Sequence, residues 1–203
     1  MSIALADEVS RFREWAATQS RTSGEWECDY PHWTALYAAT TQALDDESWR
    51  TQPAAIVYVL ARDNECEIIR AELRQRPALL RELAPSIVAA DEPDARWQLA
   101  STLGELAVDW GAALLAALAG DRDEYVRRRA LLAMGETRHP SSEHFARLAW
   151  NSGEQYPRMA ALHVLHELAV VDIDALLVAA EQSAHEYLRA AAKNVLDARR
   201  RAK

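Results

Sequence analysis

The chain has 203 residues, of which 50% are hydrophobic and 27% are charged. This composition argues against a disordered chain, and no apolar run reaches the roughly 20 residues that a membrane-spanning helix needs. The net charge of −8 argues against a general nucleic-acid binder, because binding to phosphates requires clustered positive charge.

The first helices of the chain follow no common repeat. Val9, Phe12 and Ala16 have helical spacing and predict an amphipathic helix. Residues 20–31 read as a loop. A second helix is predicted from four apolar residues at helical spacing: Trp33, Leu36, Tyr37 and Leu44.

The segment after this second helix is ambiguous in sequence. Residues 56–60, Ile-Val-Tyr-Val-Leu, would suit a buried strand or a buried helix. We expect a helix, because no second strand candidate is present to pair with it. Ile69 and Leu73 predict the next helix, which Pro77 ends. Residues 1–77 are therefore expected to form an irregular helical N-terminal cap.

A 31-residue repeat organises the rest of the chain. Its clearest marker is an arginine that recurs at Arg96, Arg127, Arg158 and Arg189. Apolar or alanine residues follow three positions later, at Leu99, Ala130, Ala161 and Ala192. An earlier apolar column keeps the same frame, at Leu83, Leu114, Phe145 and Leu176. Turn-forming residues separate the two apolar stripes of each unit, so the repeat predicts stacked helix–turn–helix pairs.

The stretches DEPDARWQLASTLGEL and GDRDEYVRRRALLAMGE resemble HEAT repeats, notably the short HEAT-like units related to phycobilin lyases. The resemblance implies an all-α, right-handed solenoid of stacked helix pairs. It also implies a ladder between repeats, formed by the recurring arginine and a turn aspartate such as Asp121. Ser152 and Ser183 replace this aspartate in the last two units, so we expect an incomplete ladder. We expect one domain over residues 1–203, with four units at 78–199 and a basic tail at 200–203.

Two histidine–glutamate pairs raise the question of a metal site. His166-Glu167 and His185-Glu186 are similar to the pairs of HEAT-like deoxyhypusine hydroxylases, which hold iron at equivalent repeat positions. Here the pairs lie at unlike positions of their units. His163 shares a helical face with the first pair, but no further zinc ligand is evident. We expect no metal and no cofactor.

The chain also shows no sequence signature of a nucleophile. Cys28 and Cys66 each lie between acidic residues, which raise the pKa of a thiol and so disfavour its reactive form. Two cysteines cannot build a disulfide framework, and the N-terminus has no secretory pattern, so we expect a cytoplasmic protein. Trp97 with Glu105 would fit a HEAT-like alkylpurine DNA glycosylase, but acidic residues oppose the cationic groove that such an enzyme needs. Most of the seven tryptophans are expected to pack in the interior.

The recurring arginines are interpreted as architectural, with hydrogen bonds to carboxylates or helix ends that link neighbouring units. The second helix of each unit should line the concave side, where positions one, five and nine after the arginine face outward. We predict that a basic partner protein binds there, and an ordinary solvated surface remains the alternative. The predicted partner-binding residues are Trp97, Glu105, Arg128, Leu132, Glu136, Met159, His163 and Glu167.

Two classes of function remain open on this sequence. The first is a non-enzymatic protein-binding scaffold, in its most specific form an immunity or inhibitor protein that caps a basic toxin. The alternative is a HEAT-like enzyme of the DNA glycosylase, bilin lyase or metal-dependent hydroxylase type. The charge and the missing catalytic motifs favour the scaffold.

Overall fold

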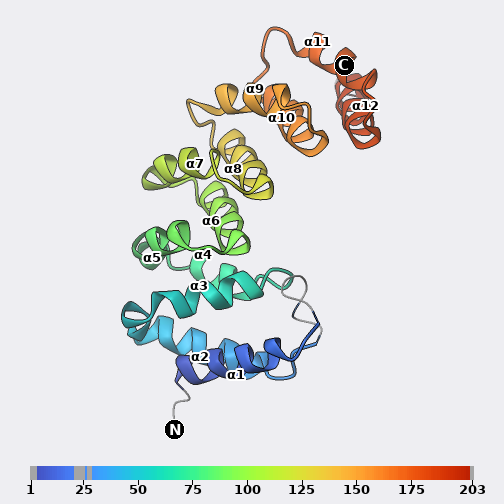
Figure 1. Ribbon diagram of the computed structural model, residues 1–203. Helices are drawn as coiled ribbons and strands as arrows, with labels where there is room; N and C mark the ends of the chain where they lie inside the picture. The colour runs from blue at the N-terminus through green and yellow to red at the C-terminus, as the bar shows by residue number, and fades with distance from the viewer. Residues whose placement is uncertain (1–3, 21–25, 27–28, 202–203) are drawn as a thin grey trace. The chain divides into compact units, whose positions relative to one another are not determined.

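The computed structural model describes residues 4–20, 26 and 29–201 (Figure 1). Over these residues the chain forms twelve α-helices and two short 3-10 helices, with no strand. The predicted all-α fold is therefore confirmed. The chain divides into two compact units, Met1–Thr102 and Leu103–Lys203, and the division falls inside one helix. Cys28 and most of the predicted loop at 20–31 lie outside the described residues.

The first compact unit contains the irregular helices, which are α1 (Leu5–Ala17), α2 (Trp33–Asp45), η1 (Ser48–Thr51), α3 (Pro53–Arg62) and α4 (Ile68–Arg74). They are followed by α5 (Pro77–Ala89) and most of α6 (Pro93–Leu106), which form the first pair of the regular repeat. The ambiguous segment 56–60 lies inside α3, so its assignment as a helix is confirmed. Pro53 and Pro77 each begin a helix, where a missing backbone N–H leaves no intrahelical bond unmade.

An aromatic cluster forms the core of this first unit. Phe12 of α1 is completely buried. Its ring centroid lies 4.7 Å from that of Tyr30, 5.4 Å from that of Trp33 and 5.9 Å from that of Tyr58. These edge-on and tilted pairs join α1, α2 and α3, so the cap has a core of its own.

The second unit contains the remaining pairs of the regular repeat. After the end of α6 come η2 (Asp109–Gly111), α7 (Ala112–Leu118), α8 (Glu124–Glu136), α9 (Ser142–Asn151), α10 (Gln155–Glu167), α11 (Ile173–Glu181) and α12 (Glu186–Arg201). Each first helix packs on its own second helix: α7 on α8, α9 on α10 and α11 on α12. The second helices also pack on one another, α8 on α10 and α10 on α12 (Figure 1). This sequential stacking is the α-solenoid arrangement that the repeat predicts. Arg200 and Arg201, predicted as tail, belong to α12.

The predicted apolar columns form the interior. Ala130, Ala161 and Ala192, three positions after the recurring arginine, are all completely buried. Met134 and Leu165, seven positions after it, are also completely buried. The 31-residue period therefore marks the positions that each unit contributes to the shared core.

Three of the four recurring arginines make the same hydrogen bond. The Nη1 atom donates to the carbonyl oxygen six residues earlier, from Arg96 to Ala90 at 2.6 Å, from Arg127 to Asp121 at 2.8 Å and from Arg189 to Ser183 at 2.7 Å. Arg158 differs, because its guanidinium lies over the ring of Trp150, 4.4 Å from the centroid. An architectural role is thus supported. The three acceptors in these bonds are turn carbonyls within the same repeat.

Serine takes over the role of the turn aspartate. In each turn the side-chain oxygen accepts the backbone N–H two residues later, from Asp123 to Asp121 at 2.8 Å, from Glu154 to Ser152 at 3.2 Å and from His185 to Ser183 at 3.1 Å. Both residue types form this local turn because each has an oxygen one or two bonds beyond Cβ. The substitutions at Ser152 and Ser183 therefore keep the turn intact.

The second helices end in a left-handed residue that also recurs every 31 positions. Ala107, Arg138 and Ala169 have φ angles of 48°, 50° and 52°. At Ala169, the N–H donates to the carbonyl of His166 at 2.9 Å, and the N–H of Val170 donates to that of Leu165 at 3.3 Å. This pair of bonds is the Schellman ending, in which glycine is the favoured residue.

Replacing Ala169 with glycine should therefore stabilise the chain. A left-handed conformation costs alanine about 1–2 kcal/mol, and the greater freedom of glycine in the unfolded chain offsets about half of that. We expect the free energy of unfolding to rise by about 0.5–1 kcal/mol in urea titrations. The same change at Ala190, an exposed interior position of α12, should lower it by about 1 kcal/mol. Destabilisation by both substitutions would contradict the left-handed ending.

Candidate partner-binding surface

Six of the predicted partner-binding residues lie together on two packed second helices. Arg128, Leu132 and Glu136 belong to α8, and Met159, His163 and Glu167 belong to α10. Glu136, His163 and Glu167 are exposed, and the other three are half-buried. We refer to these six residues as the α8–α10 surface. Their four-residue spacing places each set of three along one side of its helix.

Small residues allow the second helices to approach closely. A Cβ atom added at Gly135 of α8 would lie 2.8 Å from Cγ2 of Val164 in α10. One added at Gly104, near the end of α6, would lie 2.7 Å from Cβ of Ala133 and 2.9 Å from a carboxylate oxygen of Glu136. Only glycine fits either contact without a shift of the neighbouring helix. These contacts bring the glutamates at the ends of successive second helices near one another.

One half of the α8–α10 surface is basic. A cavity of about 250 Å³ lies between the two helices near their N-terminal halves. It is lined by Arg128, Arg129, Leu132, Tyr156, Met159, Ala160 and His163. The lining therefore combines arginine and histidine side chains with apolar ones, and it includes no carboxylate.

The other half of the α8–α10 surface carries its two glutamates. A neighbouring cavity of about 290 Å³ is lined by Gly135, Glu136, Arg138, His163, Val164, Glu167 and Leu168. His163 lines both cavities, so the two adjoin. Arg138 lines this cavity too, but among the described residues neither Glu136 nor Glu167 has a hydrogen-bond or ion-pair partner. These two carboxylates are therefore available to a positively charged group.

Both carboxylates stand at an electrostatically unfavourable end of a helix. Glu136 is the last residue of α8, and Glu167 is the last residue of α10. The C-terminus of a helix carries partial negative charge, and a carboxylate there costs about 0.3–1 kcal/mol. Glu105, the penultimate residue of α6, is exposed in the same position. These glutamates do not stabilise their own helices.

The prediction that Trp97 faces outward is wrong. Its side chain is only 6% exposed, and its Nε1 atom donates to Asp94 Oδ1 at 3.0 Å. Ser101, four residues later, is also buried. The reason is that α6 is buried on all sides, since every residue from Ala95 to Gly104 is buried. Trp97 is therefore a structural residue and not part of an exposed surface.

A family model described as HEAT repeats matches residues 80–166 and 111–202. Together these ranges span more than half of the chain. The chain belongs to the HEAT-repeat family. HEAT repeats generally mediate protein interactions, because stacked helix pairs present extended binding surfaces. No curated protein and no solved structure matches this HEAT-repeat chain.

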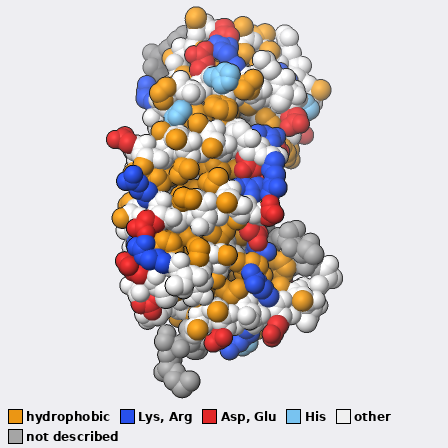
Figure 2. Space-filling view, turned by 60° about the vertical axis from the view of Figure 1, so that its left-hand side comes forward, with side chains coloured by type: hydrophobic (Ala, Val, Ile, Leu, Met, Phe, Trp, Pro, Cys, Tyr) orange, Lys and Arg blue, Asp and Glu red, His pale blue; other side chains and the backbone are white. Residues whose placement is uncertain are grey.

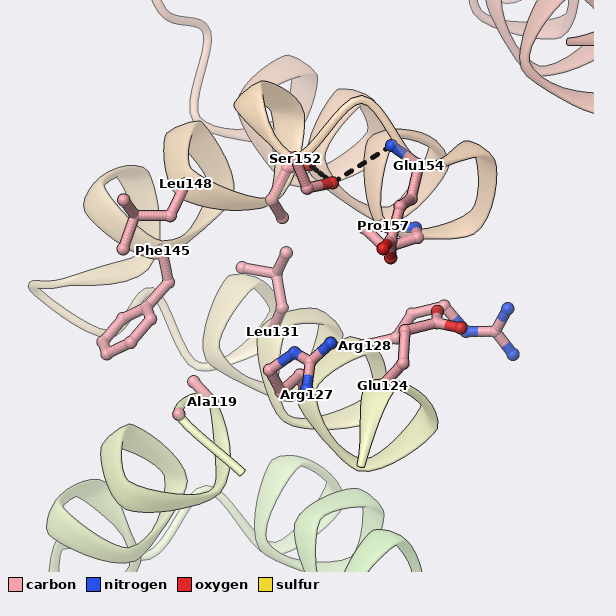
Figure 3. A pocket seen from close by; sticks show the side chains of 12 residues that line it. Ala119, Glu124, Arg127, Arg128, Leu131, Phe145, Leu148, Ser152, Glu154 and Pro157 are labelled. Carbon is pink, nitrogen blue, oxygen red and sulfur yellow. Dashed lines mark hydrogen bonds between the residues drawn. The ribbon is translucent and has the colours of Figure 1, made fainter. Parts of the chain in front are cut away.

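The second compact unit of this HEAT-repeat chain also has an apolar groove that was not predicted from the sequence. A cavity of about 320 Å³ opens between the turn after α7 and helices α8, α9 and α10, and Leu131, Phe145 and Leu148 line it (Figure 3). Leu148 is 54% exposed. Hydrophobic side chains gather along the middle of the face shown in Figure 2. A signal was present, because the equivalent positions of the neighbouring units are Ala117 and Ala179. The groove combines apolar side chains with charged ones, among them Glu124 and Arg127.

The HEAT-repeat structure does not gather the predicted histidine–glutamate pairs. His166 and Glu167 lie at the end of α10, whereas His185 precedes α12 and Glu186 begins it. The described residues contain no group of three histidine, cysteine, aspartate or glutamate side chains placed to hold a metal ion. Cys66 is exposed. None of the helices that the structure describes combines the length and hydropathy needed to cross a membrane.

Proposed function

We propose that this chain is a non-enzymatic scaffold that binds another protein through the α8–α10 surface. The observation that supports it most is the pair of carboxylates, Glu136 and Glu167, which line one cavity without a partner among the described residues. Their positions at helix C-termini lower the stability of the free protein. A cation supplied by a partner would remove that cost.

The partner is expected to present basic residues to Glu136 and Glu167. The chain as a whole carries a net charge of −8, so its field attracts a basic protein and accelerates encounter. Opposite charges at the surface act mainly on the association rate and on its salt dependence. Glu105, exposed near the end of α6, extends the half that carries the two glutamates.

Reversing one of these charges tests the proposal. The native partner is isolated by affinity capture from the source cell, and its association and dissociation rates are measured at low and high salt. Glu136→Lys should slow association about tenfold at low salt and flatten the salt dependence. The matched control is Glu181→Lys, which makes the same charge change at the exposed end of α11. Equal effects of both changes would mean that net charge alone acts and that the surface is wrongly assigned.

The most specific form of the proposal is an immunity or inhibitor protein that caps a basic toxin. Its support is electrostatic complementarity between an acidic chain and a basic target. Co-expression separates this form from a general scaffold. A toxin-capping protein should restore growth to cells that express the captured partner, and Glu136→Lys should weaken that protection. If the captured partner is not toxic, the proposal of a general protein-binding scaffold stands and the immunity role is wrong.

A further inference from the structure

The basic half of the α8–α10 surface continues into a row of exposed aromatic rings. Tyr125, Tyr156 and Tyr187 are the second residues of α8, α10 and α12 and lie 31 positions apart. They are 40%, 44% and 55% exposed. The rings of Tyr156 and Tyr187 stack, with centroids 6.3 Å apart and planes inclined by 21°. The row therefore offers aromatic area that the core does not use.

Arg128 joins the first two rings of this row. Its guanidinium carbon lies 4.6 Å from the centroid of Tyr125 and 5.3 Å from that of Tyr156. Two aromatic rings hold the side chain in place by cation–π attraction. Among the described residues, no acceptor forms a hydrogen bond or ion pair with Arg128. The guanidinium is thus fixed in position while its donors stay open to an acceptor from outside.

The cavity beside this arginine fits an acidic and apolar segment. Arg128, Arg129 and His163 supply positive or titratable groups around it, and no carboxylate lines it. Leu132 and Met159 supply apolar lining. A guanidinium held between rings binds a carboxylate by charge-assisted hydrogen bonds, and a methionine-containing lining adapts to varied apolar side chains.

We propose that the α8–α10 surface binds a peptide segment of its partner with segregated charge. An acidic residue beside a large apolar residue occupies the cavity at Arg128, and a basic residue reaches Glu136. The two ends lie eight residues apart on α8, which is about 12 Å along the helix. This inference rests on the proposed protein-binding function and refines its partner: the contacting segment is acidic at one end and basic at the other.

A peptide selection tests the segment directly. A display library of random dodecapeptides is selected on the full chain and, in parallel, on the Arg128→Ala variant. We expect peptides enriched on the full chain to carry aspartate or glutamate next to leucine, methionine or an aromatic residue. This enrichment should be lost on Arg128→Ala. Selection that yields no enriched peptides, or only basic ones, would overturn the inference.

Titration of the most enriched peptide, labelled with fluorescein, gives the magnitudes. Arg128→Ala should weaken its binding about tenfold, and Arg128→Lys should weaken it less, because the charge remains while the planar fork is lost. Lys193→Ala, an exposed change on α12, is the control for loss of positive charge and should bind as the unaltered chain does. An equal loss with Lys193→Ala would show non-specific attraction and contradict the site.

Two further results separate this inference from its alternatives. An oligothymidylate of about ten nucleotides that binds more tightly than the peptide would indicate a nucleic-acid surface, since exposed tyrosines and arginines also stack on bases. If Arg128→Ala weakens binding of the native partner and Glu136→Lys does not, the partner binds at Arg128 and the proposed contact with Glu136 is wrong. If Glu136→Lys weakens binding of the native partner and Arg128→Ala does not, the proposed function stands and the proposed acidic segment at Arg128 is wrong.

Discussion

Replacing Trp97 with alanine is expected to lower the free energy of unfolding by about 3–5 kcal/mol. The ring is 6% exposed inside α6, and truncation would leave a cavity the size of an indole. It would also remove the hydrogen bond from Nε1 to Asp94. Urea titration followed by circular dichroism at the helical band measures the loss.

Two comparisons make this result specific to burial. Trp97→Phe keeps most of the apolar volume and should lose less than half as much stability. Glu105→Ala removes an exposed side chain from the same helix and should change stability by less than about 0.5 kcal/mol. If Trp97→Ala is as stable as the unaltered chain but binds its partner weakly, Trp97 is a contact residue after all.

The repeat frame could be predicted from sequence because burial recurs with it. Ala130, Ala161 and Ala192 are all completely buried, and they lie on helices that pack in series, α8 on α10 and α10 on α12. Local turn chemistry was predictable for the same reason. A period reports what repeated units share, and the shared features are the core and the turns.

The 31-residue repeat predicted exposure wrongly where one repeat is covered by different neighbours from the others. Trp97, Arg128 and Met159 occupy one column, yet Trp97 is buried and the other two are half-buried. The repeat predicts the direction in which a side chain leaves its helix. It does not predict how completely other helices cover that helix. In α6 even Gln98 is buried, where its Nε2 atom donates to the carbonyl of Leu60 at 2.6 Å. Packing by the irregular helices decided this, and their arrangement has no repeat to reveal it.

The sequence predicted the six residues of the α8–α10 surface as partner-binding, but it did not predict how charge is distributed over that surface. The glutamates of the second helices suggested an acidic surface. The structure adds that Arg128 and Arg129 line a cavity free of carboxylates directly beside them. Sequence alone could not separate the two ends, because the direction of a long arginine side chain depends on the rings that hold it. Tyr125 and Tyr156 hold Arg128 here.

Replacing Asp63 with alanine is expected to lower the free energy of unfolding by about 3–4 kcal/mol. Asp63 follows α3 and is completely buried. Its Oδ2 atom accepts the backbone N–H of Ile69 at 2.6 Å, and its Oδ1 atom accepts the hydroxyl of Tyr37 at 2.7 Å. Removing the carboxylate leaves both donors without this acceptor in a place that water does not reach.

Three variants separate burial from capping chemistry. Asp63→Asn keeps one oxygen and should lose about half as much stability, while Tyr37→Phe removes one bond and should lose about 1 kcal/mol. Asp46→Ala is the matched control, because the Asp46 carboxylate also accepts a backbone N–H, that of Ser48 at 3.0 Å, but is exposed. Water can replace that acceptor, so its loss should be much smaller. Equal losses for Asp63→Ala and Asp46→Ala would mean that the buried carboxylate contributes no more than an exposed cap, and that α4 is held by packing alone.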